Sequence, residues 1–408
     1  MRITLLFLLM AAGAAAQIGN RVQPVGPRDF PVMAWGSSPG DAAQLREMKE
    51  AGLNVSGFCN VKDLALVRDA GLACLVADPR ARDYKWDALP PDAELRKNIA
   101  ALKADVAGNP AALGFYLRDE PPITMMPGMG KVAALLREAM PDKWPYVNLF
   151  PYRVGREALG GSDYEAYVRS LVTTIRQPFI SYDDYSLVEG EMMDYFYSAL
   201  AVVRRIGLEA NVPFWNCILA NAHFNYMEPS DATFNLQVYS TMAYGGRGIQ
   251  YFSYFSQTRG NYRLAAIDQF GNRTPTWDML RRINNQIHAL APTLLRLKST
   301  GVYHYPYVPP QCQGMQGARL VRDVKMTQSF VRPPAGAQYL LGEFEDEQKR
   351  PYVMLVNKSL KHSFRFALAL KEEGRKLVRV SPYSGQEEPF GREMDWLAPG
   401  AGMLLRIE

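Results

Sequence analysis

The chain is poor in cysteine and histidine, and both scarcities exclude classes of protein. Its 408 residues include four histidines and four widely spaced cysteines, Cys59, Cys74, Cys217 and Cys312. This spacing excludes a disulfide-rich scaffold and matches no zinc-site pattern. Cys59 and Cys74 could lie on neighbouring strands and form one disulfide, but buried free thiols are the simpler expectation, because cysteine is readily buried. We therefore expect no metal site and no cofactor.

The sequence also lacks a basic run and, beyond its N-terminus, a long apolar run. The net charge of +5 is small for this length and is spread along the chain, so nothing indicates a nucleic-acid partner. No later segment approaches the ~20 apolar residues of a membrane-spanning helix. Hydrophobic content of 48% and charged content of 21% are ordinary for a soluble globular protein. We expect no membrane partner, and the sequence leaves the oligomeric state open.

The first sixteen residues have the pattern of a secretory signal. Arg2 precedes a mostly apolar run over residues 3–10, and small residues then lead to Ala14-Ala15-Ala16 before Gln17. A short positive region, an apolar core and an A-x-A site are the three parts of a cleavable signal peptide. We therefore predict that residues 1–16 are a signal peptide and that the mature protein is secreted or periplasmic.

From about residue 30 to residue 290 the chain alternates strand-like and helix-like segments. Eight strand–helix units over roughly 260 residues match a (β/α)8 TIM barrel in count and size. A doubly wound sheet normally has fewer strands, and residues 36–40 lack the spacing of a phosphate-binding glycine turn. We therefore predict an α/β protein whose barrel covers residues 17–296. The expected strands are residues 30–36, 53–60, 72–78, 113–120, 144–152, 179–185, 212–221 and 248–255.

The hydrophobic pattern of the sequence changes after about Leu297. Short strand-like runs separated by Gly, Asp and Pro replace the helical periodicity, which predicts a small all-β sandwich domain over residues 297–408. Continuous apolar residues at 353–356 indicate a strand that is buried on both faces. The expected strands are residues 339–344, 352–357, 363–370, 377–381 and 402–407.

The most informative segment is residues 114–122, with the sequence GFYLRDEPP. Its apolar and aromatic residues favour a strand, and Pro121 disfavours the helical conformation at Glu120, so the strand ends on two carboxylates. A second pair of acids, Asp183 and Asp184, ends the sixth expected strand. Active sites of barrels are built at the carboxyl ends of their strands, so both pairs are candidates for catalysis.

Alternation of side chains along a strand indicates which acids face the barrel interior. Glu120 shares a face of the fourth strand with Tyr116 and Arg118, and Asp183 shares a face of the sixth with Ser181. Glycoside cleavage needs one carboxylic acid to protonate the leaving oxygen and a second carboxylate as nucleophile or base. We predict Glu120 as the acid and Asp183 as the second carboxylate, with Asp184 next. The alternative is that these acids form structural ion pairs.

Aromatic and polar side chains at the strand tips predict a sugar-binding surface. Aromatic rings can stack on sugars, although each ring alone is as readily explained by core packing, so their clustering is the argument. Polar groups would bind sugar hydroxyls. The predicted substrate-binding residues are Trp35, Asp119, Asn148, Tyr152, Tyr182, Trp215, Asn221, His223 and Tyr254.

These segments resemble clan A glycoside hydrolases. Residues 114–121 resemble the acid/base region of that clan, and residues 242–254 are similar to the eighth-strand region of bacterial β-galactosidase-like barrels. Residues 284–292 and the all-β region that follows resemble the tail of the same proteins. The resemblance implies a barrel with a C-terminal sandwich that cleaves a poly- or oligosaccharide, with Glu120 as the acid.

Two positions depart from the clan pattern. Clan A enzymes place Asn before the acid, where this chain has Asp119, and they carry a nucleophilic Glu on strand seven, whereas residues 214–221 contain no carboxylate. Glu228, further along, is a weaker substitute. Residues 181–185 look more like the sixth strand of chitinase-like barrels, whose Tyr and Asp assist the reaction, and this resemblance implies Asp183 as the partner.

The missing strand-seven acid leaves two other functions open. One alternative is a non-catalytic carbohydrate-binding barrel that keeps the aromatic cleft. Another is different chemistry on the same fold, such as a deacetylase, which the lack of a metal-ligand pattern disfavours.

Overall fold

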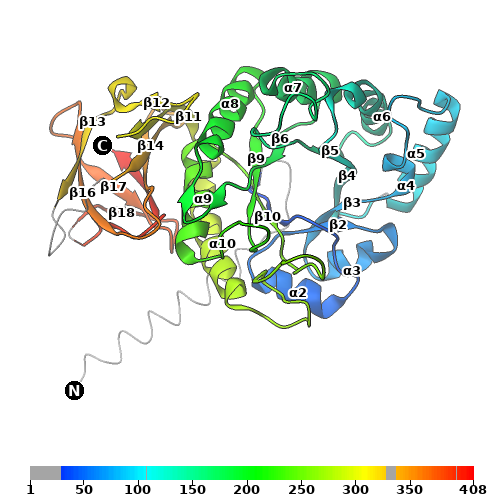
Figure 1. The fold of residues 1–408 in the computed structure, drawn as a ribbon, viewed down its shortest axis with the longest axis horizontal. Helices are drawn as coiled ribbons and strands as arrows, with labels where there is room; N and C mark the ends of the chain where they lie inside the picture. The colour runs from blue at the N-terminus through cyan, green and yellow to red at the C-terminus, as the bar shows by residue number, and fades with distance from the viewer. Residues whose placement is uncertain (1–28, 107, 328–336, 392) are drawn as a thin grey trace.

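The computed structural model describes residues 29–106, 108–327, 337–391 and 393–408. It consists of a helix-covered barrel followed by two β-sheets (Figure 1). The predicted signal peptide, residues 1–16, lies outside the described residues. Within these ranges, no helix combines the length and hydropathy needed to cross a bilayer.

Eight parallel strands form the barrel, and each overlaps a strand expected from the sequence. Their order around the sheet is β5-β4-β3-β2-β1-β10-β9-β6. A parallel bridge between Leu149 and Tyr182 joins β5 to β6, and the Leu149 N–H donates to the Ser181 carbonyl at 2.9 Å, which closes the barrel. The strands are β1 (Val32–Ala34), β2 (Val55–Cys59), β3 (Ala73–Val76), β4 (Ala112–Asp119), β5 (Trp144–Asn148), β6 (Ile180–Asp183), β9 (Phe214–Leu219) and β10 (Ile249–Phe252).

Helices cover the outside of the barrel, and polar side chains begin several of them. Asp41, Asp163, Ser230 and Thr274 accept hydrogen bonds from free backbone N–H groups of the first turn, which is the usual way to cap a helix. The helices are α2 (Ala42–Glu50), α3 (Leu64–Asp69), α4 (Pro79–Arg82), α5 (Asp92–Val106), α6 (Met126–Ala139), α7 (Tyr164–Ser170), α8 (Asp194–Ala210), α9 (Asp231–Ala243) and α10 (Pro275–Leu294).

Two helix starts have local features of interest. Helix α6 begins at Met126 and includes Gly128, a residue type that normally weakens a helix but is needed here because α6 approaches another segment closely. A Cβ on Gly128 would lie 1.8 Å from the carbonyl oxygen of Trp86. Helix α8 begins after a short hairpin formed by β7 (Leu187–Val188) and β8 (Glu191–Met192).

The C-terminal part contains a seven-stranded and a three-stranded sheet. The five strands expected from the sequence are present, and five short or polar ones were not expected. The larger sheet has the order β12-β11-β14-β15-β20-β17-β18, and the smaller β13-β16-β19. The strands are β11 (Lys298–Tyr305), β12 (Gln313–Gly314), β13 (Val321–Thr327), β14 (Tyr339–Glu345), β15 (Pro351–Asn357), β16 (Phe364–Leu370), β17 (Leu377–Val380), β18 (Glu387–Pro389), β19 (Trp396–Leu397) and β20 (Gly402–Ile407).

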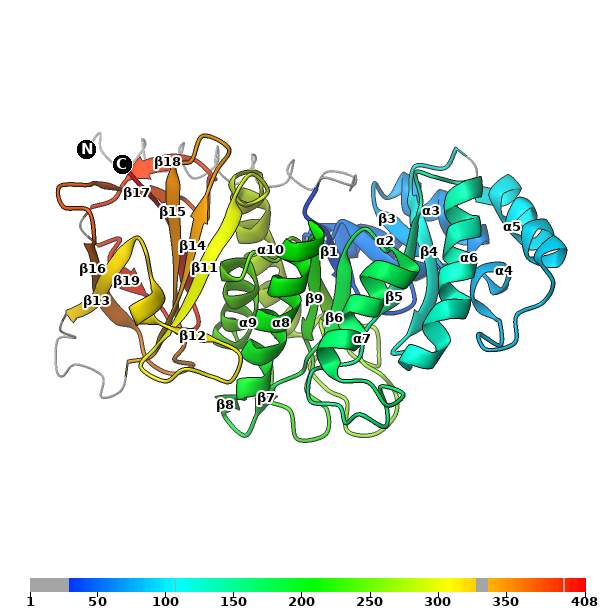
Figure 2. The ribbon, with the colours of Figure 1, turned by 90° about the horizontal axis from the view of Figure 1, so that it is seen from above.

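Strand β15 is buried on both faces, as its continuous apolar run predicts. Val353 and Leu355 belong to a cluster that also contains Phe366 of the smaller sheet, whereas Met354 and Val356 belong to the main core of the barrel. Helices α8, α9 and α10 lie between the barrel strands and the larger sheet (Figures 1 and 2). The larger sheet is therefore a middle layer between these helices and the smaller sheet.

Helix α9 lies against β14, β15 and β20, and its sequence reflects this position. Nearly all its residues are buried, because one side faces the barrel and the other faces the larger sheet. Gly342 and Gly402 allow the close approach: a Cβ on Gly342 would lie 2.3 Å from the Ala243 carbonyl oxygen, and one on Gly402 would lie 2.4 Å from the Tyr239 ring.

The two cysteines considered for a disulfide lie on neighbouring strands. Cys59 on β2 and Cys74 on β3 are both buried, and all four cysteines are free thiols. A hydrogen bond with Cys59, together with burial, holds the pKa of Cys74 well above its usual value.

Candidate active site

Three carboxylates meet at the carboxyl ends of β4, β5 and β6 around the amide of Asn148. The Asn148 Nδ2 group donates to Oδ1 of Asp183 at 2.7 Å and to Oδ1 of Asp119 at 3.3 Å. Glu120 follows Asp119 directly, and its backbone N–H donates to the Asn148 carbonyl at 2.8 Å. Because one nitrogen contacts both aspartates, their bonded oxygens lie at most about 6 Å apart.

A ladder of polar side chains inside the barrel fixes the orientation of that amide. The Tyr146 hydroxyl donates to Oε1 of Gln250 at 2.6 Å, and the Gln250 amide donates to the Ser181 hydroxyl at 2.8 Å. Ser181 then donates to Oδ1 of Asn148 at 2.9 Å. Because the oxygen of Asn148 accepts from Ser181, its NH2 group faces the carboxylates.

A β-bulge in β4 changes the predicted direction of Asp119. The pairing of β4 with β5 shifts between Tyr116 and Arg118, which interrupts the alternation of side chains. Asp119 therefore turns inward to Asn148, although simple alternation placed it on the outer face. Glu120 adopts a left-handed conformation with φ 43°, so both acids of this strand end lie at the site.

Burial raises the pKa values of all three carboxyl groups, and the charges of neighbouring carboxylates add to the shift of Glu120 and Asp183. Burial, followed by the charge of Asp119, raises the pKa of Glu120 to about 7, while Arg153 opposes the shift. Burial raises the pKa of Asp119 to about 6, and the hydrogen bond from Asn148 opposes it. Burial and then the charges of Glu120 and Asp119 hold the pKa of Asp183 well above its usual range. The group therefore retains protons at neutral pH and titrates as a coupled set.

Asp184, predicted as the next catalytic candidate, does not face the barrel interior. It shares a strand face with Tyr182, and both side chains are fully buried against the helix layer near Tyr164 of α7. The Ser186 hydroxyl donates to its Oδ1, and burial raises its pKa to about 6. A sugar at the strand ends has no access to this face. The catalytic assignment of Asp184 and the sugar-binding assignment of Tyr182 are therefore corrected.

Three further predicted sugar-binding residues lie away from the carboxylates. Trp215 stacks on Phe179 with ring centroids 3.6 Å apart and fills the opposite, N-terminal end of the barrel, because it begins β9 rather than ending it. Tyr254 is buried against α10, where the Trp277 indole donates to its hydroxyl at 3.0 Å. The ring of Tyr152 packs edge-on against Tyr164 of α7. Trp215 thus faces the interior at the wrong end of the barrel, whereas Tyr254 and Tyr152 pack against the helix layer.

Partly exposed aromatic rings surround the strand ends. Trp35, at the end of β1, contacts Phe252 edge-on at 5.7 Å, and Phe252 stacks on Tyr185 at 5.3 Å. The half-exposed ring of Tyr262 stacks on the buried ring of His223 at 4.6 Å with an interplanar angle of 5°. These rings come from separate strands and loops, and they form flat apolar surfaces of the kind on which sugars stack.

Asn221 orients His223 instead of offering its own side chain to a ligand. The side chain of Asn221 is fully buried, donates to the Ser253 hydroxyl at 2.7 Å, and accepts from Nδ1 of His223 at 2.7 Å. Burial lowers the pKa of His223 to about 4, so the ring is neutral at physiological pH. Because the ring is buried and stacked on Tyr262, the structure gives it the role of holding the Tyr262 ring in place.

The sequence analysis did not identify Arg153, a cation whose charge acts on carboxyl groups of the site. Its guanidinium lowers the pKa of both Glu120 and Asp184 and donates a hydrogen bond to the Tyr226 hydroxyl. The available signal was its position directly after Tyr152, in the loop that follows the fifth strand.

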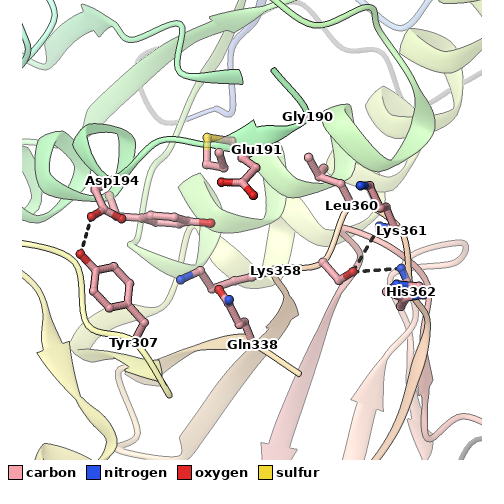
Figure 3. Close-up of a pocket in the computed structure, with 12 residues that line it drawn as sticks. Gly190, Glu191, Asp194, Tyr307, Gln338, Lys358, Leu360, Lys361 and His362 are labelled. Atoms are coloured by element: carbon pink, nitrogen blue, oxygen red, sulfur yellow. Dashed lines mark hydrogen bonds between the residues drawn. The ribbon is translucent and has the colours of Figure 1, made fainter. Parts of the chain in front are cut away.

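A cavity of about 260 Å³ lies beside these loops, between the β7–β8 hairpin, the start of α8 and the C-terminal sheets (Figure 3). Its wall carries both signs of charge: Lys358 and Lys361 come from the segment after β15, and Glu191 and Asp194 from the barrel. Burial lowers the pKa of Lys358 to about 8, and Tyr307 donates a hydrogen bond to Asp194. The three carboxylates do not line this cavity, which is therefore separate from their site.

The fold matches those of known glycoside hydrolases. A glycoside hydrolase of family 5 from Bacteroides vulgatus aligns with a TM-score of 0.55 at 11% identity, over 93% of this chain and 88% of its own. Another structure, described as a glycoside hydrolase, aligns with a TM-score of 0.53 at 11% identity. This alignment covers 93% of the present chain and 92% of the other chain. A β-galactosidase from Marinomonas ef1 aligns with a TM-score of 0.50 at 10% identity. This alignment covers 67% of the present chain and 62% of the β-galactosidase chain.

At such low identities these likenesses establish the fold alone. Protein-family profiles and curated protein sequences give no match to the chain. The two alignments over 93% of the chain include most of the C-terminal sheets as well as the barrel. The resemblance to clan A barrels that the sequence indicated is thus present in the structure.

Proposed function

We propose that the protein is a glycoside hydrolase that uses Glu120 as its general acid. The group of three carboxylates around Asn148, at the end of a barrel shared with glycoside hydrolases, is the observation that carries this proposal. With a pKa of about 7, Glu120 is roughly half protonated at neutral pH. It can therefore donate a proton to the leaving oxygen and remain a competent base afterwards.

Asp183 is the proposed second carboxylate, as nucleophile or general base. It must be ionised for either role, and burial opposes ionisation. The hydrogen bond from Asn148 favours the anion, and Asp119 shares the same amide. We propose that this pair carries one negative charge while Glu120 holds its proton, with Asp119 as the supporting member.

The proposed substrate is a poly- or oligosaccharide. The partly exposed rings of Trp35, Tyr185, Phe252 and Tyr262 form one contiguous cluster, and Tyr185 of this cluster lies near Asp183 and Asp119. We assign the catalytic barrel to residues 17–296 and a β-sandwich domain to residues 297–408. The hydrophobic cluster shared by the two C-terminal sheets supports the sandwich.

A comparison of matched variants on a glycan panel tests the proposal. We expect Glu120→Gln and Asp183→Asn to lose turnover by about 10²–10⁴-fold while glycan binding persists, and Asp119→Asn to lose less. Asp184→Asn is the control, because it makes the same change on the buried face of the same strand. If the wild type binds glycans and cleaves none, the protein is a carbohydrate-binding barrel instead.

We also propose that the protein is exported after removal of residues 1–16. The support is the Arg2, apolar and A-x-A pattern of the sequence. Mass spectrometry of the protein from the exported fraction of a bacterial host should give a chain beginning at Gln17. A full-length chain retained in the cytoplasm would contradict export.

A further inference from the structure

A second cavity lies at the opposite end of the barrel, and the charged residues that line it are all cations. It has a volume of about 320 Å³ and is bounded by the end of α8, the starts of β9 and β10, and the start of β11. Arg204, Arg247 and Lys298 line it, and its lining contains no Asp or Glu. The cavity of Figure 3, by contrast, carries charges of both signs.

The two arginines are partly buried without a carboxylate partner. Among the described residues, Arg204 donates through Nε to the Ser299 hydroxyl at 2.8 Å, and Arg247 donates through Nη2 to the Leu297 carbonyl at 3.0 Å. No ion pair involves either group within the described ranges, whereas the adjacent Arg205 pairs with Glu165. Burial lowers the pKa of both guanidinium groups, which is the signature of cations that lack a nearby anion.

A guanidinium has five N–H donors, so most donors of this pair are free of protein acceptors in the described structure. Buried cations are normally paired, because an isolated charge is costly to remove from water. Arginine binds carboxylate, sulfate and phosphate groups through two parallel hydrogen bonds. The missing partner is therefore best supplied by an oxyanion from outside the chain.

The size of the cavity indicates what carries the oxyanion. One water molecule occupies about 30 Å³ in the liquid, so an inorganic ion would fill only a small part of the space. The volume falls at the lower end of the range of small-molecule sites, roughly 300–1,000 Å³. We propose that this cavity, here named the arginine cavity, binds the oxyanion group of a sugar-sized molecule through Arg204 and Arg247.

The arginine cavity does not depend on the proposed hydrolase activity. It lies where β9 and β10 begin, whereas the carboxylates lie where β4 and β6 end. It also adjoins β11, the first strand of the C-terminal sheets, so a bound anion would join the barrel to those sheets.

Calorimetric titration of the full chain tests the proposal at a fixed ionic strength set with NaCl. The probes are glucose 6-phosphate, inorganic phosphate and glucose. We expect glucose 6-phosphate to bind at least tenfold more tightly than inorganic phosphate, and glucose not to bind. Equal affinities for glucose 6-phosphate and inorganic phosphate would contradict the proposal that the ligand is sugar-sized. No binding of either anion to the wild type would overturn the site.

Arginine variants separate this site from general charge attraction. We expect Arg204→Met and Arg247→Met to weaken glucose 6-phosphate binding at least tenfold. Arg296→Met is the matched control, because Arg296 is exposed nearby and does not line the cavity. Undiminished binding in both cavity variants would refute the assignment. If either variant fails to fold, Arg247→Lys replaces it, because lysine keeps the positive charge but cannot make a bidentate contact. Unchanged affinity of Arg247→Lys for glucose 6-phosphate would also refute the assignment.

Discussion

The side-chain amide of Asn148 donates a 2.7 Å hydrogen bond to Asp183 and thereby ties the tip of β5 to the tip of β6. These are the two strands between which the barrel closes. Because the same nitrogen also contacts Asp119, one side chain sets the relative position of carboxylates from both sides of the closure. The backbone contacts that close the barrel and the side-chain contacts that assemble the candidate site thus come from neighbouring residues of the same two strand ends.

Removal of the Asn148 amide should change the pH dependence of activity. Its hydrogen bonds lower the pKa of both Asp119 and Asp183, so Asn148→Ala should raise both values. A base must be ionised, so the acidic limb of the kcat/KM–pH profile should move to higher pH by about one to two units. Asn98→Ala on the outer helix α5 should leave the limb in place. An unmoved limb in Asn148→Ala would exclude the proposed coupling.

The role of Glu120 as a proton donor predicts a dependence on the leaving group. Glu120→Gln should cost about 10²–10⁴-fold in kcat on natural glycosides but far less on dinitrophenyl glycosides, whose leaving group needs no proton. Wild-type activity should fall as the pH rises through about 7, where Glu120 loses its proton, and the variant should lack this limb. Equal losses on both kinds of substrate would contradict the assignment.

Asp184 should make the protein less stable as the pH rises. Its pKa of about 6 exceeds the ~3.9 of an unfolded chain, so its contribution to stability is complete below about pH 4 and is lost as the pH rises through 6. Asn does not titrate. Between pH 4 and pH 8, the free energy of unfolding of Asp184→Asn should therefore gain about 2–3 kcal/mol relative to wild type. Urea unfolding at both pH values measures this gain, and a constant difference would show that Asp184 is not perturbed.

A methyl group on Gly114 should disturb the site strand. A Cβ there would lie 2.1 Å from the Trp144 carbonyl oxygen, between β4 and β5. Gly114→Ala should therefore destabilise the fold by about 1–3 kcal/mol or more and lower activity, because β4 carries Asp119. Gly155→Ala is the matched control, since nothing lies within 4 Å of a Cβ at that position. Thermal unfolding of both variants checks the difference, and similar midpoints would be evidence against the close contact.

The barrel could be predicted because its strands carry strong local signals. Each of the eight is a short apolar run bounded by Gly, Pro, Asn or Asp, and Val32–Ala34 and Ile249–Phe252 begin and end the series as expected. Strands β13 and β18 were missed because their residues are largely polar and exposed, and such strands form by pairing with a neighbour rather than by their own pattern.

The candidate site was predicted in part. Alternation placed Asp183 inside the barrel, on the face of Ser181, and its hydrogen bond with Asn148 locates it there. Alternation failed for Asp119, because the bulge in β4 adds a residue that no sequence pattern announces. Trp215 was assigned wrongly for a different reason. It lies near the start of its strand, both in the expected range 212–221 and in β9, so its side chain reaches the N-terminal end of the barrel.

Helix α9 has one further consequence, which concerns where the molecule can be divided. One side of α9 packs on the barrel and the other on β14, β15 and β20, and Gly342 and Gly402 allow this second contact to be close. A chain cut before β11 would leave the sheet-facing side of α9 open to water. The barrel therefore depends on the larger sheet to cover part of its own surface, and a barrel expressed alone is expected to aggregate.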